Sequence, residues 1–252
     1  MIPSVNPKPP KKVLLVGATG FSGQGVLTVL SDNPLFELTA HVRPDSPNKE
    51  ALENICTEKH ISILCVHFSE SASKITELEP DIILSFIGTT SKKMRTLGQS
   101  YMDIDFEINE TLIAIAESLP KPPLYIYMSS MGIEWAGWSP YLEARLAVEQ
   151  RLARSILPHI ILRPGLLHGP SRTESRPLEH LSAILTSRFC EGLMWIGLKE
   201  LSYKWKPLTA EDIGIIVQHL LMAHQKNDDI NRERIIDIVG MHQVIQTASH
   251  SI

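Results

Sequence analysis

The chain lacks a cysteine framework, a long apolar run and an excess of charge of one sign. Its three cysteines, Cys56, Cys65 and Cys190, show no metal-ligand spacing, and an odd number gives no disulfide scaffold. No stretch approaches the roughly 20 apolar residues that a membrane span needs. A net charge of -4 gives no general attraction to nucleic acid. We therefore expect a cytoplasmic protein with no metal site and neither nucleic acid nor a membrane as partner.

The N-terminal segment also lacks the apolar run of a secretory signal. Residues 1–12, MIPSVNPKPPKK, are rich in proline and lysine and predict a flexible leader. No internal repeat, low-complexity tract or second hydrophobic unit interrupts residues 13–252. We therefore expect these residues to form a single domain, with a small C-terminal part that covers the substrate.

Strand-like and helix-like segments alternate from Val13 onward, which is typical of parallel βαβ units. Helices are predicted between the strands by apolar residues at helical spacing, as in 112–119 and 213–220. The sequence thus predicts a doubly wound, mostly parallel α/β Rossmann sheet of about seven strands, with helices on both faces. The short apolar runs that predict the strands are Val13–Val16, Leu38–Val42, Ile61–Val66, Ile82–Ile87, Leu124–Met128, His159–Leu162 and Ile235–Val239.

A glycine-rich turn follows the first predicted strand. The segment GATGFSGQG spaces Gly17, Gly20 and Gly23 as G-x-x-G-x-x-G before a plausible helix. Glycines let the backbone turn sharply against a pyrophosphate, while the helix N-terminus attracts negative charge. Thr19 and Ser22 could add hydroxyl contacts. An ordinary glycine-rich turn is the alternative, but strand, spacing and helix together favour a dinucleotide site.

The second predicted strand ends in AHVRP. A dinucleotide fold that prefers NAD usually has Asp or Glu at that point, to bind the ribose 2′-hydroxyl. Arg43 offers instead a guanidinium fork that suits the 2′-phosphate of NADP. The sequence therefore predicts NADP (NADPH) as cofactor. A solvated surface arginine is the alternative, and Asp45 keeps NAD open.

The fifth predicted strand ends in Ser129 and Ser130, and Tyr141 follows at the start of a helix that Ser139 would cap. Tyr141 and Arg145 are four residues apart, so they share one helix face. Tyr141 could exchange a proton with a carbonyl or alcohol oxygen that Ser130 holds, while the cation stabilises the tyrosinate. The alternatives are that Tyr141 only packs and that Arg145, like other arginines of this helix, lies on a solvated face.

These segments together resemble the short-chain dehydrogenase/reductase superfamily, and within it the atypical branch of the thirty-kilodalton HIV Tat-interacting protein. The resemblance covers nearly the whole chain and rests on GATGFSG, SFIGTT, YMSSMG, Y-x-x-x-R and LRPGLLHGPSRTESRP. It implies an NAD(P)-binding protein in which Tyr141 is the acid/base and Ser130, with Ser129 beside it, its partner. The superfamily pattern is Y-x-x-x-K, so Arg145 is a departure that keeps the charge and changes its geometry.

The resemblance also implies a set of cofactor contacts. Ile87 and Gly88 would lie beneath the adenosine side, Leu167 against the nicotinamide, and Arg176 over the cofactor or substrate. Leu167 as a core residue and Arg176 as a solvated loop charge are the alternatives. The full set is Gly17, Thr19, Gly20, Phe21, Ser22, Gly23, Arg43, Ile87, Gly88, Thr89, Tyr141, Arg145, Pro164, Gly165, Leu167 and Arg176.

Three functions agree with this pattern. The first is an NADP-dependent oxidoreductase acting on a small carbonyl or alcohol. The second is an NADPH-binding regulatory or redox-sensing protein with little turnover and a protein partner. A nucleotide-sugar epimerase or dehydratase ranks last, because only 252 − 141 = 111 residues follow Tyr141 to finish the sheet and build a sugar-nucleotide domain.

Overall fold

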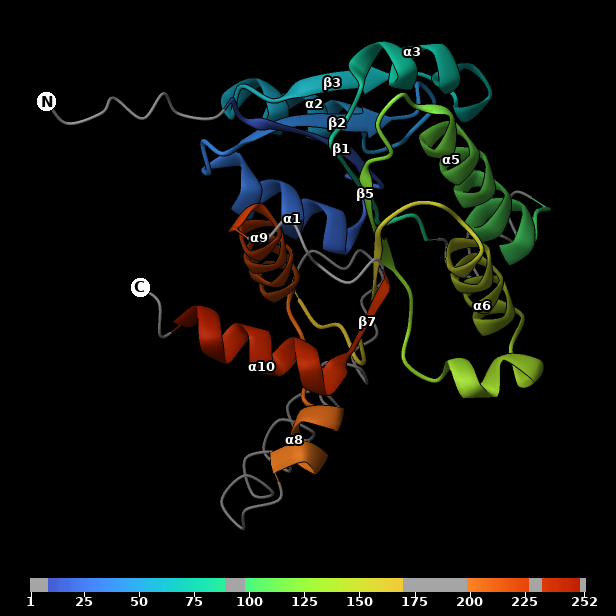
Figure 1. Cartoon of the computed structure of the whole chain (residues 1–252), viewed down its shortest axis with the longest axis vertical. Coiled ribbons are helices and arrows are strands. Elements are labelled where there is room, and N and C mark those ends of the chain that lie inside the picture. The colour runs from blue at the N-terminus through green and yellow to red at the C-terminus, as the bar shows by residue number, and fades with distance from the viewer. Residues whose placement is uncertain (1–8, 89–97, 170–198, 227–232, 250–252) are drawn as a thin grey trace, which may run out of the picture.

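One seven-stranded, wholly parallel sheet forms the centre of the molecule, with strand order β3-β2-β1-β4-β5-β6-β7. It is seen in a computed structural model that describes residues 9–88, 98–169, 199–226 and 233–249 (Figure 1). The predicted doubly wound Rossmann architecture is confirmed. The strands are β1 (Lys11–Val16), β2 (Phe36–Val42), β3 (Ser62–Cys65), β4 (Ile82–Ser85), β5 (Leu124–Met128), β6 (His159–Arg163) and β7 (Glu233–Asp237).

Helices cover both faces of this sheet. In Figure 1, α1, α9 and α10 lie on one side of the strands and α5 and α6 on the other. The α-helices are α1 (Phe21–Ser31), α2 (Lys49–Glu58), α3 (Ser71–Leu78), α5 (Glu107–Ser118), α6 (Pro140–Ala153), α8 (Lys199–Trp205), α9 (Ala210–Lys226) and α10 (Ile238–Ser249). Shorter turns are η1 (Phe68–Glu70), η2 (Met102–Phe106, a π-helical turn) and η3 (Ile133–Trp138).

The core has two layers, one on each face. Along β1, Val13 and Leu15 join the cluster that includes α1 and α9, while Leu14 and Val16 join the cluster that includes α5 and α6. Side chains alternate between the faces of a strand, so a strand with helices on both sides must be apolar throughout. That is why the central strands β4 (IILS) and β5 (LYIYM) are almost wholly apolar and buried, whereas the edge strand β3 (SILC) is partly exposed.

Two glycines let α1 and α9 cross with their backbones in contact. A Cβ on Gly25 would lie 1.9 Å from the carbonyl oxygen of Ala210, and one on Gly214 would lie 2.5 Å from the carbonyl oxygen of Gly25. Neither approach leaves room for a side chain. This crossing fixes α9 beside the helix that starts at the glycine turn.

Several strand ends differ from prediction by one or two residues, and two of them have a clear cause. The last strand stops at Asp237, whereas the sequence predicted it to run to Val239. Asp237 Oδ1 accepts a hydrogen bond from the Gly240 N–H at 2.9 Å, which caps α10 and starts the helix at Ile238. At the other end, β1 begins at Lys11 within the predicted leader, because Lys11 and Lys12 pair in register with Phe36 and Glu37 of β2. No helix among the described residues is long and apolar enough to span a membrane.

Candidate functional site

The glycine turn between β1 and α1 lies against the end of β4. Gly17 has a φ of +88°, in the region that favours glycine, and a Cβ there would lie 2.5 Å from the carbonyl oxygen of Phe86. The Gly20 N–H donates to the Gly17 carbonyl at 2.9 Å, and a Cβ on Gly23 would meet the same oxygen at 2.2 Å. The turn therefore leaves no room for a side chain at Gly17 or Gly23, which is the tight form expected of a phosphate-binding loop.

The start of α1 suits a negatively charged ligand. Its N-cap, Gly20, makes no side-chain capping bond, and the first turn contains no acidic residue. The first N–H groups of a helix have no acceptor within the helix and lie at its positive end. Thr19 lines the pocket beside this turn. These features fit a pyrophosphate-bearing cofactor.

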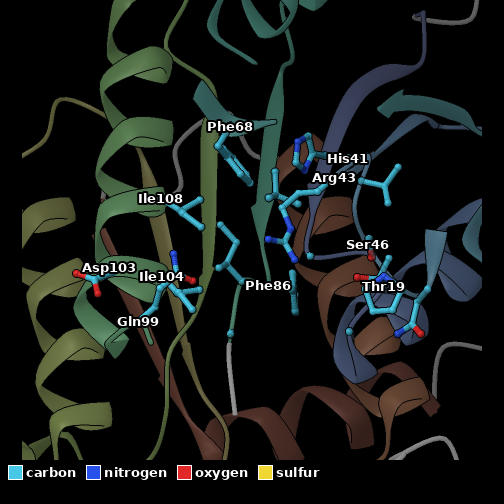
Figure 2. A pocket seen from close by; sticks show the side chains of 18 residues that line it. Thr19, His41, Arg43, Ser46, Phe68, Phe86, Gln99, Asp103, Ile104 and Ile108 are labelled. Atoms are coloured by element: carbon cyan, nitrogen blue, oxygen red, sulfur yellow. The ribbon is translucent and has the colours of Figure 1, made fainter. Parts of the chain in front are cut away.

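A cavity of about 310 Å³ opens at the carboxyl ends of β1, β2 and β4 (Figure 2). It brings together several residues that the sequence analysis selected: Gly17, Thr19, Gly20, Arg43, Ile87 and Gly88. It also has lining residues that the sequence analysis missed, namely Val16, His41, Val42, Ser46, Pro47, Asn48, Phe68, Phe86, Gln99, Asp103, Ile104 and Ile108. Ligands of open α/β sheets bind at this edge, outside the carboxyl ends of the strands.

Arg43 extends from the end of β2 toward the middle of this cavity (Figure 2). Its side chain is 47% exposed, and its Nη1 lies 3.8 Å from Asp45 Oδ2. Asp45 also lies 3.9 Å from Nδ1 of His67, so one exposed carboxylate faces two basic side chains. An exposed ion pair at this distance holds its partners weakly. The guanidinium of Arg43 therefore remains available to an incoming anion.

His41 forms the buried part of the same wall. Its Nε2 lies 3.0 Å from the carbonyl oxygen of Val66, and its ring packs against Phe68 with centroids 4.4 Å apart. Burial lowers the pKa of His41 to about 4, so the ring is neutral at physiological pH. The sequence contained a signal for His41 that was not used. Residues two apart in a strand point to the same face, so the selection of Arg43 should have included His41.

Tyr141 lies in the first turn of α6. Ser139 caps that helix as predicted, its Oγ accepting from the Leu142 N–H at 3.4 Å. The ring of Tyr141 is partly buried and meets Tyr101 edge-on, with centroids 5.4 Å apart. The guanidinium carbon of Arg145 lies 5.2 Å from the centroid of the Tyr141 ring. Tyr141 and Arg145 thus share a helix face, as their spacing predicted.

Arg145 is buried, with a relative exposure of 4%, so the alternative of a solvated helix face is wrong. Its Nη1 donates to the carbonyl oxygens of Ile87 at 3.0 Å and Met128 at 2.7 Å, and to Tyr127 Oη at 3.2 Å. Its Nη2 lies 3.6 Å from Oδ2 of Asp105, which is fully buried. The cation thus joins α6 to the ends of β4 and β5 and to η2. Burial raises the pKa of Tyr127 to about 12, which keeps its hydroxyl protonated.

The two serines at the end of β5 have different surroundings. Ser129 is buried, and its Oγ donates to Glu149 Oε1 at 2.5 Å. Glu149 in turn accepts two bonds from the guanidinium of Arg163. Ser130 is partly exposed, and its Oγ donates to the Met131 carbonyl at 3.1 Å. Ser130 is therefore the accessible serine, whereas Ser129 belongs to a buried ion-pair group.

The segment after β6 runs back toward the start of α1. The carbonyl of Pro164 accepts from the Met131 N–H at 2.8 Å, and a Cβ on Gly169 would lie 2.7 Å from the ring of Phe21. Leu167 forms an isolated bridge with Leu208 and packs against the core. This placement agrees with the alternative that Leu167 fills core. Thr89 and Arg176, two predicted contact residues, lie outside the described residues.

Two further predicted contacts, Gly165 and Ser22, do not line the cavity. Gly165 packs against Ile238 of α10, where a Cβ would lie 3.4 Å from its side chain. Ser22 lies in the first turn of α1. Among the residues that the structure describes, no group of three His, Cys, Asp or Glu side chains is arranged to hold a metal ion.

The sequence of the chain matches the model of a known protein family. The model of the NAD dependent epimerase/dehydratase family matches residues 13–238, which is most of the chain. The chain belongs to this family. It is an extended Rossmann family that binds an NAD(P) nucleotide, so the resemblance to the short-chain dehydrogenase/reductase superfamily is confirmed at that level. Membership in the narrower branch stays a prediction.

Curated fungal proteins are similar over most of their length. The protein fmp52-1, mitochondrial, of Aspergillus terreus is 26% identical over 215 residues, which cover 85% of this chain and 87% of that protein. The protein fmp52, mitochondrial, of Emericella nidulans is 29% identical over 170 residues, covering 66% of this chain and 71% of the relative. The matched region therefore covers most of the length of these relatives.

Solved structures share the fold. The UDP-Glc/GlcNAc 4-epimerase of Campylobacter jejuni aligns with a TM-score of 0.65 at 16% identity, covering 94% of this chain and 82% of that one. The UDP-glucuronic acid 4-epimerase of Bacillus cereus, in complex with UDP-glucuronic acid and NAD, aligns with a TM-score of 0.63 at 17% identity, covering 90% and 77%. At these identities the likeness concerns the fold and not the substrate.

The cytoplasmic location expected from the sequence is wrong on this comparison. Four curated relatives, from four Aspergillus and Emericella strains, are all named mitochondrial. The expectation rested on the lack of a secretory signal, which is recognised by its apolar run. Mitochondrial transit peptides are amphipathic and rich in arginine and serine instead, so a missing apolar run carries no information about them.

Proposed function

We propose that the protein is an NADP-dependent oxidoreductase acting on a small carbonyl or alcohol. The observation that carries the proposal is the position of Arg43, a half-exposed guanidinium in the cavity that the glycine turn also lines. The family supplies the nucleotide-binding fold, and Arg43 supplies the preference for a phosphorylated ribose. A guanidinium fork binds a phosphate through two parallel charge-assisted hydrogen bonds.

Cofactor and chain have separate tasks in this reaction. When bound, the nicotinamide supplies or accepts the hydride that reduces a carbonyl carbon or oxidises an alcohol carbon. The phenol of Tyr141 donates the matching proton to the carbonyl oxygen in the reducing direction and takes it back in the other. Ser130, the accessible serine at the end of β5, turns its hydroxyl from the Met131 carbonyl to that oxygen and holds it by a hydrogen bond. Reduction thus adds one hydride and one proton to the substrate.

Cofactor affinities test the NADP preference. Dissociation constants for NADPH and NADH, measured by calorimetry, should favour NADPH in the unmodified chain. Arg43→Ala should remove most of that preference, because a charge-assisted phosphate contact accounts for about tenfold to a hundredfold in affinity. Asp45→Asn is the matched control on the same rim. It frees Arg43 from its carboxylate partner and should raise the preference slightly. Equal constants in the unmodified chain would refute NADP.

Turnover tests the role of Tyr141. A panel of small aldehydes, ketones and alcohols is screened for cofactor oxidation or reduction. Tyr141→Phe should leave the dissociation constant for NADPH nearly intact and abolish the turnover, since only the proton donor is lost. Turnover that survives this change would contradict the assignment.

A second function has one observation in its favour. The Nη1 group of Arg145 faces two carbonyl oxygens and a phenol, and Nη2 faces a buried carboxylate. This leaves the cation poorly placed to contact the cofactor, as the lysine of Y-x-x-x-K does. An NADPH-binding regulatory protein, whose occupancy is sensed by a protein partner, would need no such contact. Tight NADPH binding without turnover on any substrate of the panel would favour it.

We also propose that the protein acts in mitochondria, by analogy with its curated relatives. Fractionation of cells that express the full chain with a C-terminal tag tests this. Enrichment with a mitochondrial marker is the expected result. Recovery in the soluble cytosolic fraction alone would contradict it.

A further inference from the structure

Arg145 occupies a junction of four elements. From α6 its guanidinium reaches the carbonyl oxygens of Ile87 after β4 and Met128 in β5, the phenol of Tyr127, and the carboxylate of Asp105 in η2. Both charged partners are almost wholly buried, with side-chain exposures of 5% and 0%. The pair thus ties the helix that carries Tyr141 to the strand ends beside the cavity.

The same guanidinium supports the cavity wall. A Cβ on Gly88 would lie 2.7 Å from Arg145 Nη2, so the planar group lies directly against the backbone of Gly88. Ile87 and Gly88 both line the cofactor cavity. These wall residues thus line the cavity and also contact the guanidinium, which is not itself among the residues that line it. A shift of the guanidinium would change the position of this wall.

A lysine would not fill this place. Its ammonium is a compact charge on a flexible stem, whereas the guanidinium is a plane with donors fixed in a fork. Here Nη1 donates to the carbonyl oxygens of Ile87 and Met128, and Nη2 faces the carboxylate of Asp105. One ammonium nitrogen has no second donor group to span from the carbonyls to the carboxylate. The structure thus depends on the shape of arginine as well as on its charge.

We propose that Arg145, held by Asp105, is a positioning residue that fixes the Ile87–Gly88 wall of the cofactor cavity, and that it acts through this backbone without touching the cofactor. The inference rests on the proposed function, because it takes the cavity as the NADPH site. It reassigns Arg145 from the contact that the resemblance implies to a support of the wall. Asp105 becomes a residue required for cofactor affinity, although it does not line the cavity.

Burial explains why the pair would act as a unit. A buried ion pair adds little to stability compared with apolar packing, but the loss of one partner leaves an uncompensated charge in a low-dielectric interior. Removing Asp105 should therefore displace the guanidinium, and removing the guanidinium should displace the wall. Changes at the two positions are expected to be non-additive, because they break one contact chain.

The test measures NADPH affinity and backbone protection together. Arg145→Lys and Asp105→Asn should each weaken NADPH binding about tenfold or more, as expected for a lost charged hydrogen bond. The double variant should be no weaker than the poorer single variant. Arg151→Lys is the matched control, because Arg151 lies on the same helix but pairs with Glu110 and Glu117 away from the cavity. It should bind NADPH as the unmodified chain does.

Hydrogen exchange gives a readout that needs no cofactor. The Phe86 N–H donates to the carbonyl of Val16 at 2.9 Å. Protection of this N–H from exchange therefore reports whether the segment directly before Ile87 and Gly88 keeps its position. Faster exchange at Phe86 to Gly88 in Arg145→Lys than in Arg151→Lys supports the proposal. If Arg145→Lys does not fold, Asp105→Asn gives the same comparison.

The outcomes separate this proposal from the proposed function. If the unmodified chain binds neither NADPH nor NADH, the proposed function fails, and exchange at Phe86 to Gly88 alone decides whether Arg145 fixes the wall. If the chain binds NADPH and Arg145→Lys binds it equally well or better, with unchanged exchange, the positioning role is overturned. Additive losses in the double variant would also overturn it.

Discussion

The two ends of the cofactor edge carry the same kind of cation in opposite surroundings. At the glycine-turn end the edge is hollow, and Arg43 stands half exposed in a cavity of about 310 Å³. At the Tyr141 end the edge is filled, and Arg145 is 4% exposed among carbonyl oxygens and a carboxylate. Both residues are arginines, but the N–H donors of Arg43 remain accessible to a ligand, whereas those of Arg145 are engaged by neighbouring protein groups.

This difference suggests separate roles for the two arginines: Arg43 would bind the nucleotide, and Arg145 would hold the shape of the site. An exposed guanidinium with one weak partner keeps its donors for a ligand, and its net effect is seen only when the ligand is present. A buried guanidinium with several partners has its geometry fixed before any ligand arrives. The cavity end is therefore expected to decide which nucleotide binds, and the filled end to decide how the site is shaped. Three pairs of variants test this division.

Gly17→Ala should show the largest effect, because it forces a methyl group against the backbone of Phe86 at the glycine-turn end, where a Cβ would lie 2.5 Å from the carbonyl oxygen. The left-handed backbone costs about 1 kcal/mol for a non-glycine residue, and displacing the Phe86 carbonyl costs about 1–3 kcal/mol more. Urea denaturation should thus show a loss of about 2–4 kcal/mol in the free energy of unfolding. NADPH binding should be lost with it.

Gly98→Ala is the matched control for this change. Gly98 also has a positive φ, of +66°, but a Cβ there would meet no atom of the described residues within 4 Å. It should cost only about 1 kcal/mol, the backbone part alone. Equal losses for the two variants would mean that the close approach of the turn to β4 has no energetic weight.

The pH dependence of stability tests the buried side of the cavity wall. The pKa of His41 is lowered to about 4 in the folded state, so the unfolded chain takes up this proton first as the pH falls below about 6.5. Stability is present above pH 6.5 and is lost as the pH falls toward 4, by up to about 3 kcal/mol at 1.36 kcal/mol per pH unit.

His41→Gln should flatten the slope of unfolding free energy between pH 6.5 and 4, because no proton is taken up there on unfolding. His67→Gln is the control, since that ring is 49% exposed on the same rim and its loss removes no buried group. The slope is measured by urea denaturation at several pH values. An unchanged slope in His41→Gln would mean that His41 is not held neutral by its surroundings.

A smaller effect is expected from the serines at the filled end. Ser129→Ala removes a buried hydrogen bond to Glu149 and should cost about 1–2 kcal/mol in the free energy of unfolding. Ser130→Ala should change stability by less than about 0.5 kcal/mol, since that side chain is partly exposed. For any substrate that is turned over, Ser130→Ala should lower kcat more than Ser129→Ala. The reverse order would place the catalytic hydroxyl on Ser129.

Local sequence determined much of the frame. Short apolar runs predicted a strand at each of the seven places, because the strands of a sheet that helices cover on both faces are mostly apolar. Glycine spacing predicted the tight turn at Gly17, since only glycine tolerates that φ and that approach to Phe86. Ser139 followed by Pro140 predicted the start of α6. Each of these signals depends on residues close together in the chain.

Tertiary structure alone decided the environment of the functional side chains. The position of Arg145 depends on carbonyls from two strands and on Asp105, residues 17 to 58 positions away along the chain, so no local pattern could distinguish a buried cation from a solvated one. The same holds for Ser129, whose partner is the Glu149–Arg163 pair. Burial and partners set the charge, donors and access of a side chain, and they arise only when distant segments pack together.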